Sequence, residues 1–313
     1  MGTIAFVFPG QGAQAVGMGK DVYDALPQSR EIFEKGDAAL GFELSRLVFE
    51  GPDSDLKQTA NTQPALLTAS VAYLEALKGH GLTPAYVAGH SLGEYSALVA
   101  AGVLEYEDAV RLVRLRGRFM EEAVPGGQGA MAAVLGAERD ALAALCSDIA
   151  AAGTPVELAN VNCPGQIVVS GSAEGVNAVV ERVKEAGGKR AIPLEVSGPF
   201  HSSLMKEAAV RLEAELQKVT FRAPSVPVVV NVTAEPVTDP EEIRSLLVKQ
   251  VYSPVLWQDS VERLIAAGVD TFVEIGSGSV LAGLIRKIDK TVKVINVNSL
   301  ASLQALDEAA ANE

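Results

Sequence analysis

The chain has 313 residues, of which 48% are hydrophobic and 21% are charged, and its formal net charge is −13. This is an ordinary globular composition, and the length suits one large domain with a smaller lobe inserted in it. The negative charge repels polyphosphate backbones over most of the surface, so we exclude nucleic acid as the main partner.

The N-terminal segment predicts neither a membrane anchor nor a signal peptide. No apolar run approaches the roughly 20 residues that a membrane-spanning helix needs. A short strand pattern at 4–8 turns at once into Pro-Gly-Gln-Gly at 9–12, without a basic start or a longer apolar stretch. We expect a cytoplasmic protein that does not contact a membrane.

Cysteine and histidine are too scarce for a metal centre. Cys146 and Cys163 are too far apart for a CxxC motif and too few for a disulfide framework. The chain has three histidines, and none belongs to a cluster with ligand spacing. We therefore expect two free thiols and no bound metal.

Strand and helix patterns alternate along most of the chain. We predict buried strands at 4–8, 86–89, 228–231, 271–275 and 292–296, and helices between them that include 65–78 and 106–122. Strands that alternate with helices predict an α/β fold with a mainly parallel sheet, covered on both faces.

The loop after the first strand reads Gly-Gln-Gly-Ala-Gln-Ala at 10–15 and superficially matches a dinucleotide fingerprint. The acidic residue expected about 20 positions later should close a second strand, but Glu31 and Glu34 lie in a helical pattern. A loop that carries an amide side chain and exposed N–H groups suits an oxyanion hole better.

The next strand leads into Gly89-His90-Ser91-Leu92-Gly93, which fits the G-x-S-x-G nucleophile elbow. A helix pattern over 94–101 follows, so the first free N–H groups of that helix point toward the serine. The context favours Ser91 as a nucleophile, and a plain turn before a helix is the alternative.

The helix predicted at 106–122 places one arginine apart from the others. On a helical wheel, Arg111, Arg114 and Arg118 fall within about 60° of one another, whereas Arg116 lies on the apolar side. We expect the first three to be solvated and Arg116 to point inward. A buried guanidinium needs a partner, either an internal carboxylate or the carboxylate of a substrate.

The middle of the chain has a different order of elements. Strands at 130–135, 156–162, 166–170 and 189–194 and helices at 138–151 and 173–186 give the βαββαβ order of a ferredoxin-like unit. Turn-forming residues bracket it at 125–127 and 197–199. We predict a large α/β catalytic domain of residues 1–126 and 197–313, a ferredoxin-like inserted subdomain of residues 127–196, and a ligand site in the cleft between them.

A serine nucleophile needs a base, which is usually histidine. His80 follows a predicted helix at an exposed end, and His90 adjoins Ser91 on a tight turn, where neighbouring side chains point apart. His201 begins a helical segment at the lobe boundary and is the candidate by elimination. A structural residue at a helix start is its alternative.

No acid stands where a hydrolase triad would need one. The candidates between Ser91 and His201 all lie in amphipathic helical patterns; they are Asp108, Asp140 and Asp148. We expect a carbonyl or an amide to orient His201 instead.

Five motifs together resemble the malonyl-CoA:acyl carrier protein transacylase family, and the match runs nearly the whole chain. They are Phe8-Pro9-Gly10-Gln11-Gly12, Gly89-His90-Ser91-Leu92-Gly93, Arg116-Gly117, Gly198-Pro199-Phe200-His201-Ser202 and Gln250-Val251-Tyr252-Ser253-Pro254-Val255. The resemblance implies a hydrolase-like α/β domain with a ferredoxin-like insert. One departure is Gly276-Ser277-Gly278, where the family commonly has Gly-Pro-Gly.

The resemblance also implies roles for individual residues. Ser91 would be the nucleophile and His201 its base, oriented by the main-chain carbonyl of Gln250. Gln11 and the Leu92 N–H would form the oxyanion hole. A substrate carboxylate would bind Arg116.

Further candidates surround these residues. Asn160 and Asn162 lie between the lobes and would support the site. Phe200, beside the base, would fill the space that an α-methyl group needs, so methylmalonyl should be a poor substrate.

The family's activity is the transfer of malonyl from coenzyme A to acyl carrier protein in fatty-acid biosynthesis, with the coenzyme A thioester as substrate and no cofactor. The elbow alone supports a serine hydrolase or thioesterase equally well, and a non-catalytic carrier-binding subunit would keep the same fold.

Acyl carrier proteins are acidic, so this acidic chain needs a local cationic surface to bind one. The candidates for it are Lys189, Arg190, Lys206, Arg286 and Lys287.

Overall fold

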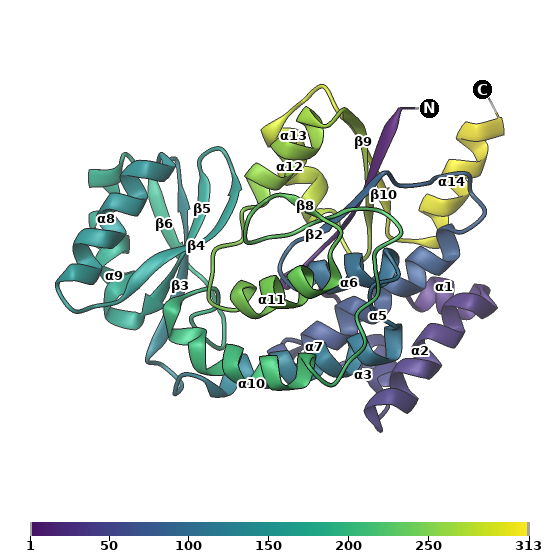
Figure 1. The fold of residues 1–313 in the computed structure, drawn as a ribbon, viewed down its shortest axis with the longest axis horizontal. Coiled ribbons are helices and arrows are strands. Elements are labelled where there is room, and N and C mark those ends of the chain that lie inside the picture. The colour runs from purple at the N-terminus through teal and green to yellow at the C-terminus, as the bar shows by residue number, and fades with distance from the viewer. Residues whose placement is uncertain (1, 312–313) are drawn as a thin grey trace.

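Two β-sheets organise the computed structural model, which describes residues 2–311 (Figure 1). Sheet A has six strands in the order β10-β9-β1-β2-β7-β8, and every pair is parallel except β7 with β8. Its strands are β1 (Thr3–Phe8), β2 (Tyr86–Gly89), β7 (Val228–Val229), β8 (Pro236–Val237), β9 (Val269–Ile275) and β10 (Lys293–Val297). The predicted mainly parallel sheet is confirmed.

Helices cover both faces of sheet A, and the alternation of side chains along β1 shows which core each face joins. Ile4, Phe6 and Phe8 pack toward α5 (Thr59–Leu77) and α6 (Gly93–Ala100), whereas Ala5 and Val7 pack toward α12 (Trp257–Ala266) and α13 (Val280–Ile288). The strand therefore has no polar face, as expected for a strand buried between two helical layers.

The remaining helices of the large lobe lie around this core (Figure 1). They are α1 (Lys20–Ala25), α2 (Pro27–Leu40), α3 (Leu44–Glu50), α4 (Asp53–Leu56), α7 (Tyr106–Glu122), α10 (Lys206–Leu216), α11 (Pro240–Gln250) and α14 (Leu300–Ala311). A short 3₁₀ turn, Ser203–Met205, precedes α10. Among the described residues, no helix is both long enough and apolar enough to cross a membrane.

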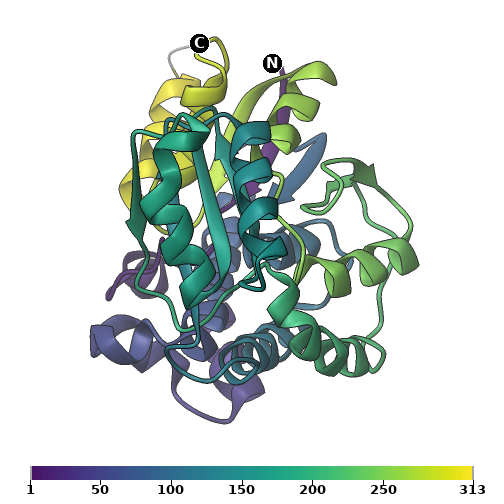
Figure 2. The same cartoon turned by 90° about the vertical axis from the view of Figure 1, so that its left-hand side faces the viewer.

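Sheet B is antiparallel, has the strand order β4-β5-β3-β6, and forms the small lobe (Figure 2). Its strands and helices are β3 (Gly129–Leu135), α8 (Arg139–Ala151), β4 (Val156–Cys163), β5 (Gln166–Ser172), α9 (Ala173–Arg182) with a 3₁₀ turn (Val183–Ala186), and β6 (Arg190–Pro193). One face carries α8 and α9 over a separate apolar core, and the other face turns Met131 and Val168 toward the large lobe. The βαββαβ order is confirmed; the subdomain boundaries at 127 and 196 stay a prediction.

Most elements differ from their predicted bounds by one or two residues, and two of the differences have a clear physical reason. Helix α5 begins at Thr59 rather than at 65, although Pro64 inside it has no N–H for the carbonyl of Ala60. Arg114 Nη1 donates to that carbonyl at 2.7 Å instead. Arg114 is therefore half-buried rather than solvated.

Strand β7 is shorter than predicted and ends at Val229. The next two residues turn away from the sheet: the Val230 N–H donates to the Glu235 carbonyl at 3.2 Å, and the Asn231 N–H donates to the Glu94 carboxyl at 2.9 Å. These bonds replace strand pairing and carry Asn231 under the elbow.

The two lobes are joined by backbone hydrogen bonds at the floor of the cleft. The Val161 N–H donates to the Val255 carbonyl at 2.9 Å, and the Val255 N–H donates to the Ala159 carbonyl at 2.8 Å. Beside them, Arg139 forms a bidentate ion pair with Asp259, both distances 2.8 Å. Strand β4 of the small lobe is thus tied to the loop that follows α11.

Candidate active site

Ser91 lies on a sharp turn between β2 and α6, with φ at 52° in the left-handed region. The turn is possible because its glycines lie against backbone: a Cβ on Gly89 would be 1.9 Å from the carbonyl carbon of Gly93, and a Cβ on Gly93 would be 2.1 Å from the Phe8 carbonyl oxygen. The elbow predicted from the sequence therefore has the strand–turn–helix geometry that it requires.

The amide side chain of Asn231 holds two backbone groups of the elbow. Asn231 Oδ1 accepts from the Ser91 N–H at 2.8 Å, and Asn231 Nδ2 donates to the Gly89 carbonyl at 2.6 Å. The first bond is partly buried and the second is buried, so the strained Ser91 backbone is fixed from outside the turn.

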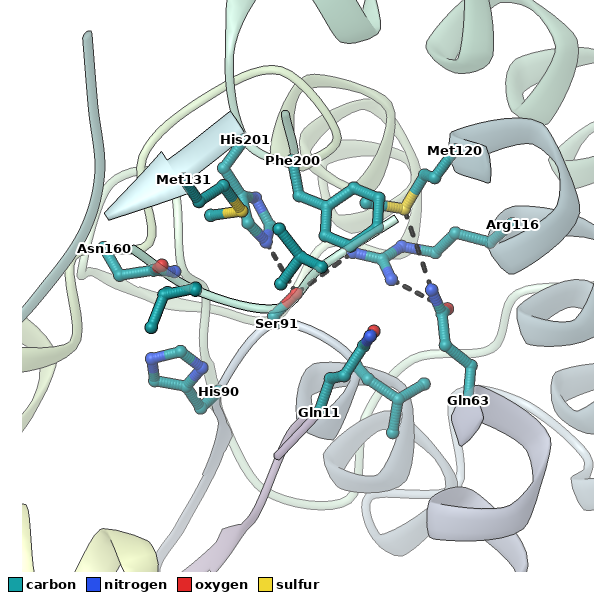
Figure 3. Close-up of a pocket in the computed structure, with 13 residues that line it drawn as sticks. Gln11, Gln63, His90, Ser91, Arg116, Met120, Met131, Asn160, Phe200 and His201 are labelled. Carbon is teal, nitrogen blue, oxygen red and sulfur yellow. Dashed lines mark hydrogen bonds between the residues drawn. The ribbon is translucent and has the colours of Figure 1, made fainter. Parts of the chain in front are cut away.

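His201 contacts the serine directly (Figure 3). Its Nε2 is 2.7 Å from Ser91 Oγ, and its Nδ1 is 2.8 Å from the main-chain carbonyl of Gln250. The carbonyl accepts only, so Nδ1 carries the proton and Nε2 accepts from the serine hydroxyl. Burial, with the positive charge of Arg116, lowers the pKa of His201 to about 3, so the imidazole is neutral near pH 7.

Arg116 is buried, with 1% of its surface exposed, and its guanidinium lies against Ser91. Nη1 donates to Gln63 Oε1 at 2.8 Å, and Nη2 donates to Gln250 Oε1 at 3.0 Å and to Ser91 Oγ at 3.2 Å. Its Nε has no partner among the described residues. Burial lowers the pKa of Arg116, but arginine stays protonated in proteins. A cation whose hydrogen-bond partners are all neutral has the chemistry to bind an anion.

A cavity of about 120 Å³ opens between the lobes in front of these residues (Figure 3). Its apolar wall consists of Met120, Met131, Leu194, Val196 and Phe200. Serine, histidine and arginine meet at its floor. The arrangement can take a proton from the serine hydroxyl while the guanidinium binds an anionic substituent of the acyl group.

Three further predicted site residues border this cavity: Gln11, Leu92 and Phe200. Gln11 follows β1, and its side-chain amide donates to Thr59 Oγ1 at 3.0 Å. Leu92 is the N-cap residue of α6, so its N–H has no partner inside the helix. Phe200 is 6% exposed and lies on the side of the cavity opposite Gln11.

Asn160 lines the cavity from β4, whereas Asn162 lies behind it and contacts His90 Nε2 through Oδ1 at 2.8 Å. His90 faces the cavity too, and burial lowers its pKa, but no hydrogen bond joins it to Ser91. His80 is far away, with Nδ1 at 2.6 Å from Asp307.

Two of the three aspartates weighed as partners of His201 form ion pairs with other residues. Asp108 pairs with Arg111, and Asp148 pairs with Arg182. Among residues 2–311 no group of three or more metal-ligating side chains is assembled.

Comparison with known proteins identifies the family. The model described as "Acyl transferase domain" matches residues 5–309. The malonyl CoA-acyl carrier protein transacylase of Bacillus subtilis is 52% identical over 304 residues, covering 97% of this chain and 96% of the relative. The Escherichia coli K12 enzyme of the same name is 49% identical over 306 residues, covering 97% and 99%. The chain belongs to the malonyl-CoA:acyl carrier protein transacylase family.

Solved structures of the family agree over the whole chain. An acyl carrier protein S-malonyltransferase from Vibrio cholerae superposes with a TM-score of 0.94 at 48% identity, covering 97% of this chain and 99% of that one. A malonyl-transacylase in complex with a type II PKS acyl-carrier protein gives a TM-score of 0.94 at 44% identity, covering 98% and 99%. The hydrolase-like fold with a small inserted sheet is thus the fold of the family.

Three buried polar residues of this transacylase-family site are missing from the candidates found in the sequence: Gln63, Glu94 and Asn231. Gln63 is a polar side chain in the apolar helix α5, and Asn231 stands where a buried strand was expected to end. Either position could have signalled a functional amide. Glu94 gives no such signal, because an acid in the first turn of a helix is ordinary capping.

Proposed function

We propose that the chain transfers a malonyl group from coenzyme A to the phosphopantetheine thiol of an acyl carrier protein, through a malonyl ester on Ser91, in fatty-acid biosynthesis. One observation carries the choice of acyl group: the buried Arg116 guanidinium is 3.2 Å from Ser91 Oγ and is held by carboxamides and a hydroxyl. A carboxylate at the far end of the acyl group supplies the charge that this cation lacks.

In the first half-reaction, the Ser91 hydroxyl gives its proton to His201 Nε2 while Oγ attacks the thioester carbonyl. The carbonyl oxygen becomes an oxyanion, which the Leu92 N–H and Gln11 stabilise. The carbon–sulfur bond then breaks, and the coenzyme A sulfur leaves with the proton from His201. The Gln250 carbonyl keeps the imidazole in the required tautomer, at 2.8 Å from Nδ1.

The second half-reaction reverses the first with a new thiol. The carrier's phosphopantetheine thiol gives its proton to His201, and its sulfur attacks the malonyl ester. The bond to Ser91 Oγ breaks, and Oγ recovers the proton. Phe200 limits the space beside the α-carbon and so disfavours methylmalonyl, while Asn160 and Asn162 support the floor of the cleft.

The proposal is tested by intact mass of the purified protein after brief incubation with malonyl-CoA, followed by addition of an acyl carrier protein. We expect a malonyl adduct that passes to the carrier thiol, and no adduct on a Ser91→Ala variant. An adduct released only to water would instead support a serine hydrolase or thioesterase, and no adduct at all would support a non-catalytic carrier-binding subunit.

The contact of 2.7 Å between Ser91 and His201 argues against the non-catalytic alternative, since a scaffold would not need it. The absence of a cofactor and the cytoplasmic location stay predictions from the sequence.

A further inference from the structure

Glu94 is a buried carboxyl group that the reaction steps above do not use. It lies in the first turn of α6, three residues after the nucleophile, and only 1% of its surface is exposed. Its Oε2 accepts two hydrogen bonds, from the Asn231 N–H at 2.9 Å and from Gln250 Nε2 at 3.0 Å. Its Oε1 has no partner among the described residues.

Helix capping does not explain this arrangement. An acid in the first turn of a helix gains from the helix dipole while it stays in water. Glu94 points inward instead, and burial raises its pKa to about 7 against the opposing effects of Asn231, Gln250 and Arg116. Burying this carboxyl group is unfavourable, and one of its oxygens accepts from both donors. We therefore look for the function of Glu94 in these two hydrogen bonds.

Each donor acts on a group at the reaction centre. Asn231 fixes the Ser91 N–H through Oδ1 at 2.8 Å. Gln250 gives its main-chain carbonyl to His201 at 2.8 Å and its side-chain oxygen to Arg116 at 3.0 Å. Glu94 therefore stands one contact away from the nucleophile, the base and the cation at once.

Glu94 favours one of the two orientations of the Gln250 carboxamide. A carboxamide has one accepting oxygen and one donating NH₂ group, so it faces Arg116 correctly only when its NH₂ faces an acceptor. Three acceptors face that NH₂ group: Glu94 Oε2 and the Ser91 carbonyl, each at 3.0 Å, and Asn231 Oδ1 at 3.3 Å. Glu94 also accepts from the Asn231 N–H, so it supports two of these three contacts. A flipped amide would set its NH₂ against the guanidinium and release Arg116 from Gln250.

We propose that Glu94 is a positioning residue of the transfer reaction: by hydrogen bonding, it orients Gln250 toward Arg116 and holds Asn231 beneath Ser91. The inference rests on the proposed malonyl transfer. The hydrogen bonds of Glu94, rather than its charge, perform this function.

The test measures, by intact mass, the rate constants for labelling of Ser91 with malonyl-CoA and, separately, with acetyl-CoA. The ratio of the malonyl constant to the acetyl constant reports the position of Arg116 and is independent of the folded fraction.

Three variants of Glu94 are compared by this ratio. In Glu94→Ala the ratio should fall by about tenfold or more. Glu94→Asp keeps a carboxyl group but withdraws it from both donors, so its ratio should also fall. Glu94→Gln keeps an accepting oxygen in place, so its ratio should stay within about threefold of the native value.

Glu274 is the matched control. It is a second fully buried glutamate, whose carboxyl accepts the N–H groups of Leu281 and Ala282 at 3.0 and 2.8 Å, away from Ser91 and Arg116. Glu274→Ala should lower the melting temperature and leave the ratio unchanged.

Two results would overturn the inference: ratios equal to the native value in all three Glu94 variants, or a native ratio in Glu94→Asp with a reduced ratio in Glu94→Gln. If the unsubstituted protein itself forms no malonyl adduct, the proposed function fails first. The two failures are therefore distinguishable. Should Glu94→Ala not fold, the contrast between the aspartate and glutamine variants still decides.

Discussion

His201 is buried as a neutral imidazole, and its burial makes the stability of the folded chain depend on pH below neutrality. Its pKa is lowered to about 3 in the folded chain, while an exposed histidine titrates near 6.5. Between these values the unfolded chain binds a proton that the folded chain does not. The free energy of unfolding therefore falls as the pH falls below about 6.5.

We predict that this histidine alone lowers the free energy of unfolding by about 2 kcal/mol between pH 7 and pH 5. A His201→Asn variant should lose less stability than the native chain over this interval, by about that amount. Urea unfolding at the two pH values measures the difference. Ser91→Ala keeps the imidazole and should follow the native pH dependence; an equal loss in His201→Asn and the native chain would refute the prediction.

Single residues were predictable where one side chain broke a periodic pattern. Arg116 stands alone on the apolar side of its helix, and it is indeed buried. The same wheel is misleading for Arg114, because its hydrogen bond to the Ala60 carbonyl depends on a proline in another helix. The periodicity of α7 describes that helix alone. It carries no information about the backbone N–H that Pro64 lacks in the neighbouring helix α5.

At the scale of elements, the elbow depends on the close approach of α6 to the end of β1. Gly93 allows it, since any Cβ there would lie 2.1 Å from the Phe8 carbonyl oxygen. The obstacle is backbone on both sides and cannot rotate away, unlike a flexible side chain. The glycine is thus required by packing, independent of the chemistry at Ser91.

Gly93→Ala should therefore destabilise the chain by at least about 3 kcal/mol. Gly283→Ala is the control: it lies in helix α13, where an added Cβ meets nothing within 4 Å, and it should stabilise by about 0.5 to 1 kcal/mol. Thermal and urea unfolding measure both. A Gly93→Ala variant as stable as the native chain would show that the two elements can move apart.

The order of elements was predictable because each buried strand or amphipathic helix carries its own local pattern, as at Tyr86–Gly89 and Tyr106–Glu122. The ends of the helices and strands were less predictable. The start of α5 was missed because Pro64 usually begins a helix or breaks it, and the end of β7 was missed because Asn231 bonds Glu94, which is distant in sequence.

At the scale of the whole molecule, a net charge of −13 must coexist with an acidic partner under the proposed function. Lys189 and Arg190 are exposed and lie at the start of the edge strand β6. Leu194, which lines the cavity, follows within about 13 Å of extended chain. This edge of the small lobe is therefore placed to meet a carrier whose prosthetic thiol enters the cleft.

We predict that reversing both charges, Lys189→Glu with Arg190→Glu, lowers kcat/KM for the carrier by about tenfold at low salt and by less at high salt. The control reverses Lys290 and Lys293, exposed cations at the opposite end of β10 from the site. Transfer from malonyl-serine to the carrier is measured at several salt concentrations. Equal kinetics of the two double variants would remove this edge from the docking surface.

The assembly of the site could be predicted only in part. Ser91 and His201 lie in recognisable motifs, but the network around Glu94 brings it together with Asn231 and Gln250, which are 137 and 156 positions away in the chain. No local sequence pattern predicts such contacts. Each residue fits the pattern of its own helix or loop, and only the tertiary fold brings the three side chains together.

The backbone bonds between β4 and Val255 determine how the cleft can work. Val255 exchanges bonds at 2.8 and 2.9 Å with the small lobe. It lies in the short loop that follows Gln250, the last residue of α11, whose carbonyl accepts from His201. Swinging the small lobe outward would break both bonds and the Arg139–Asp259 pair beside them. Separating the lobes at this contact is therefore opposed by these bonds. Under the proposed function, the thioester substrates would reach Ser91 without the lobes having to part here.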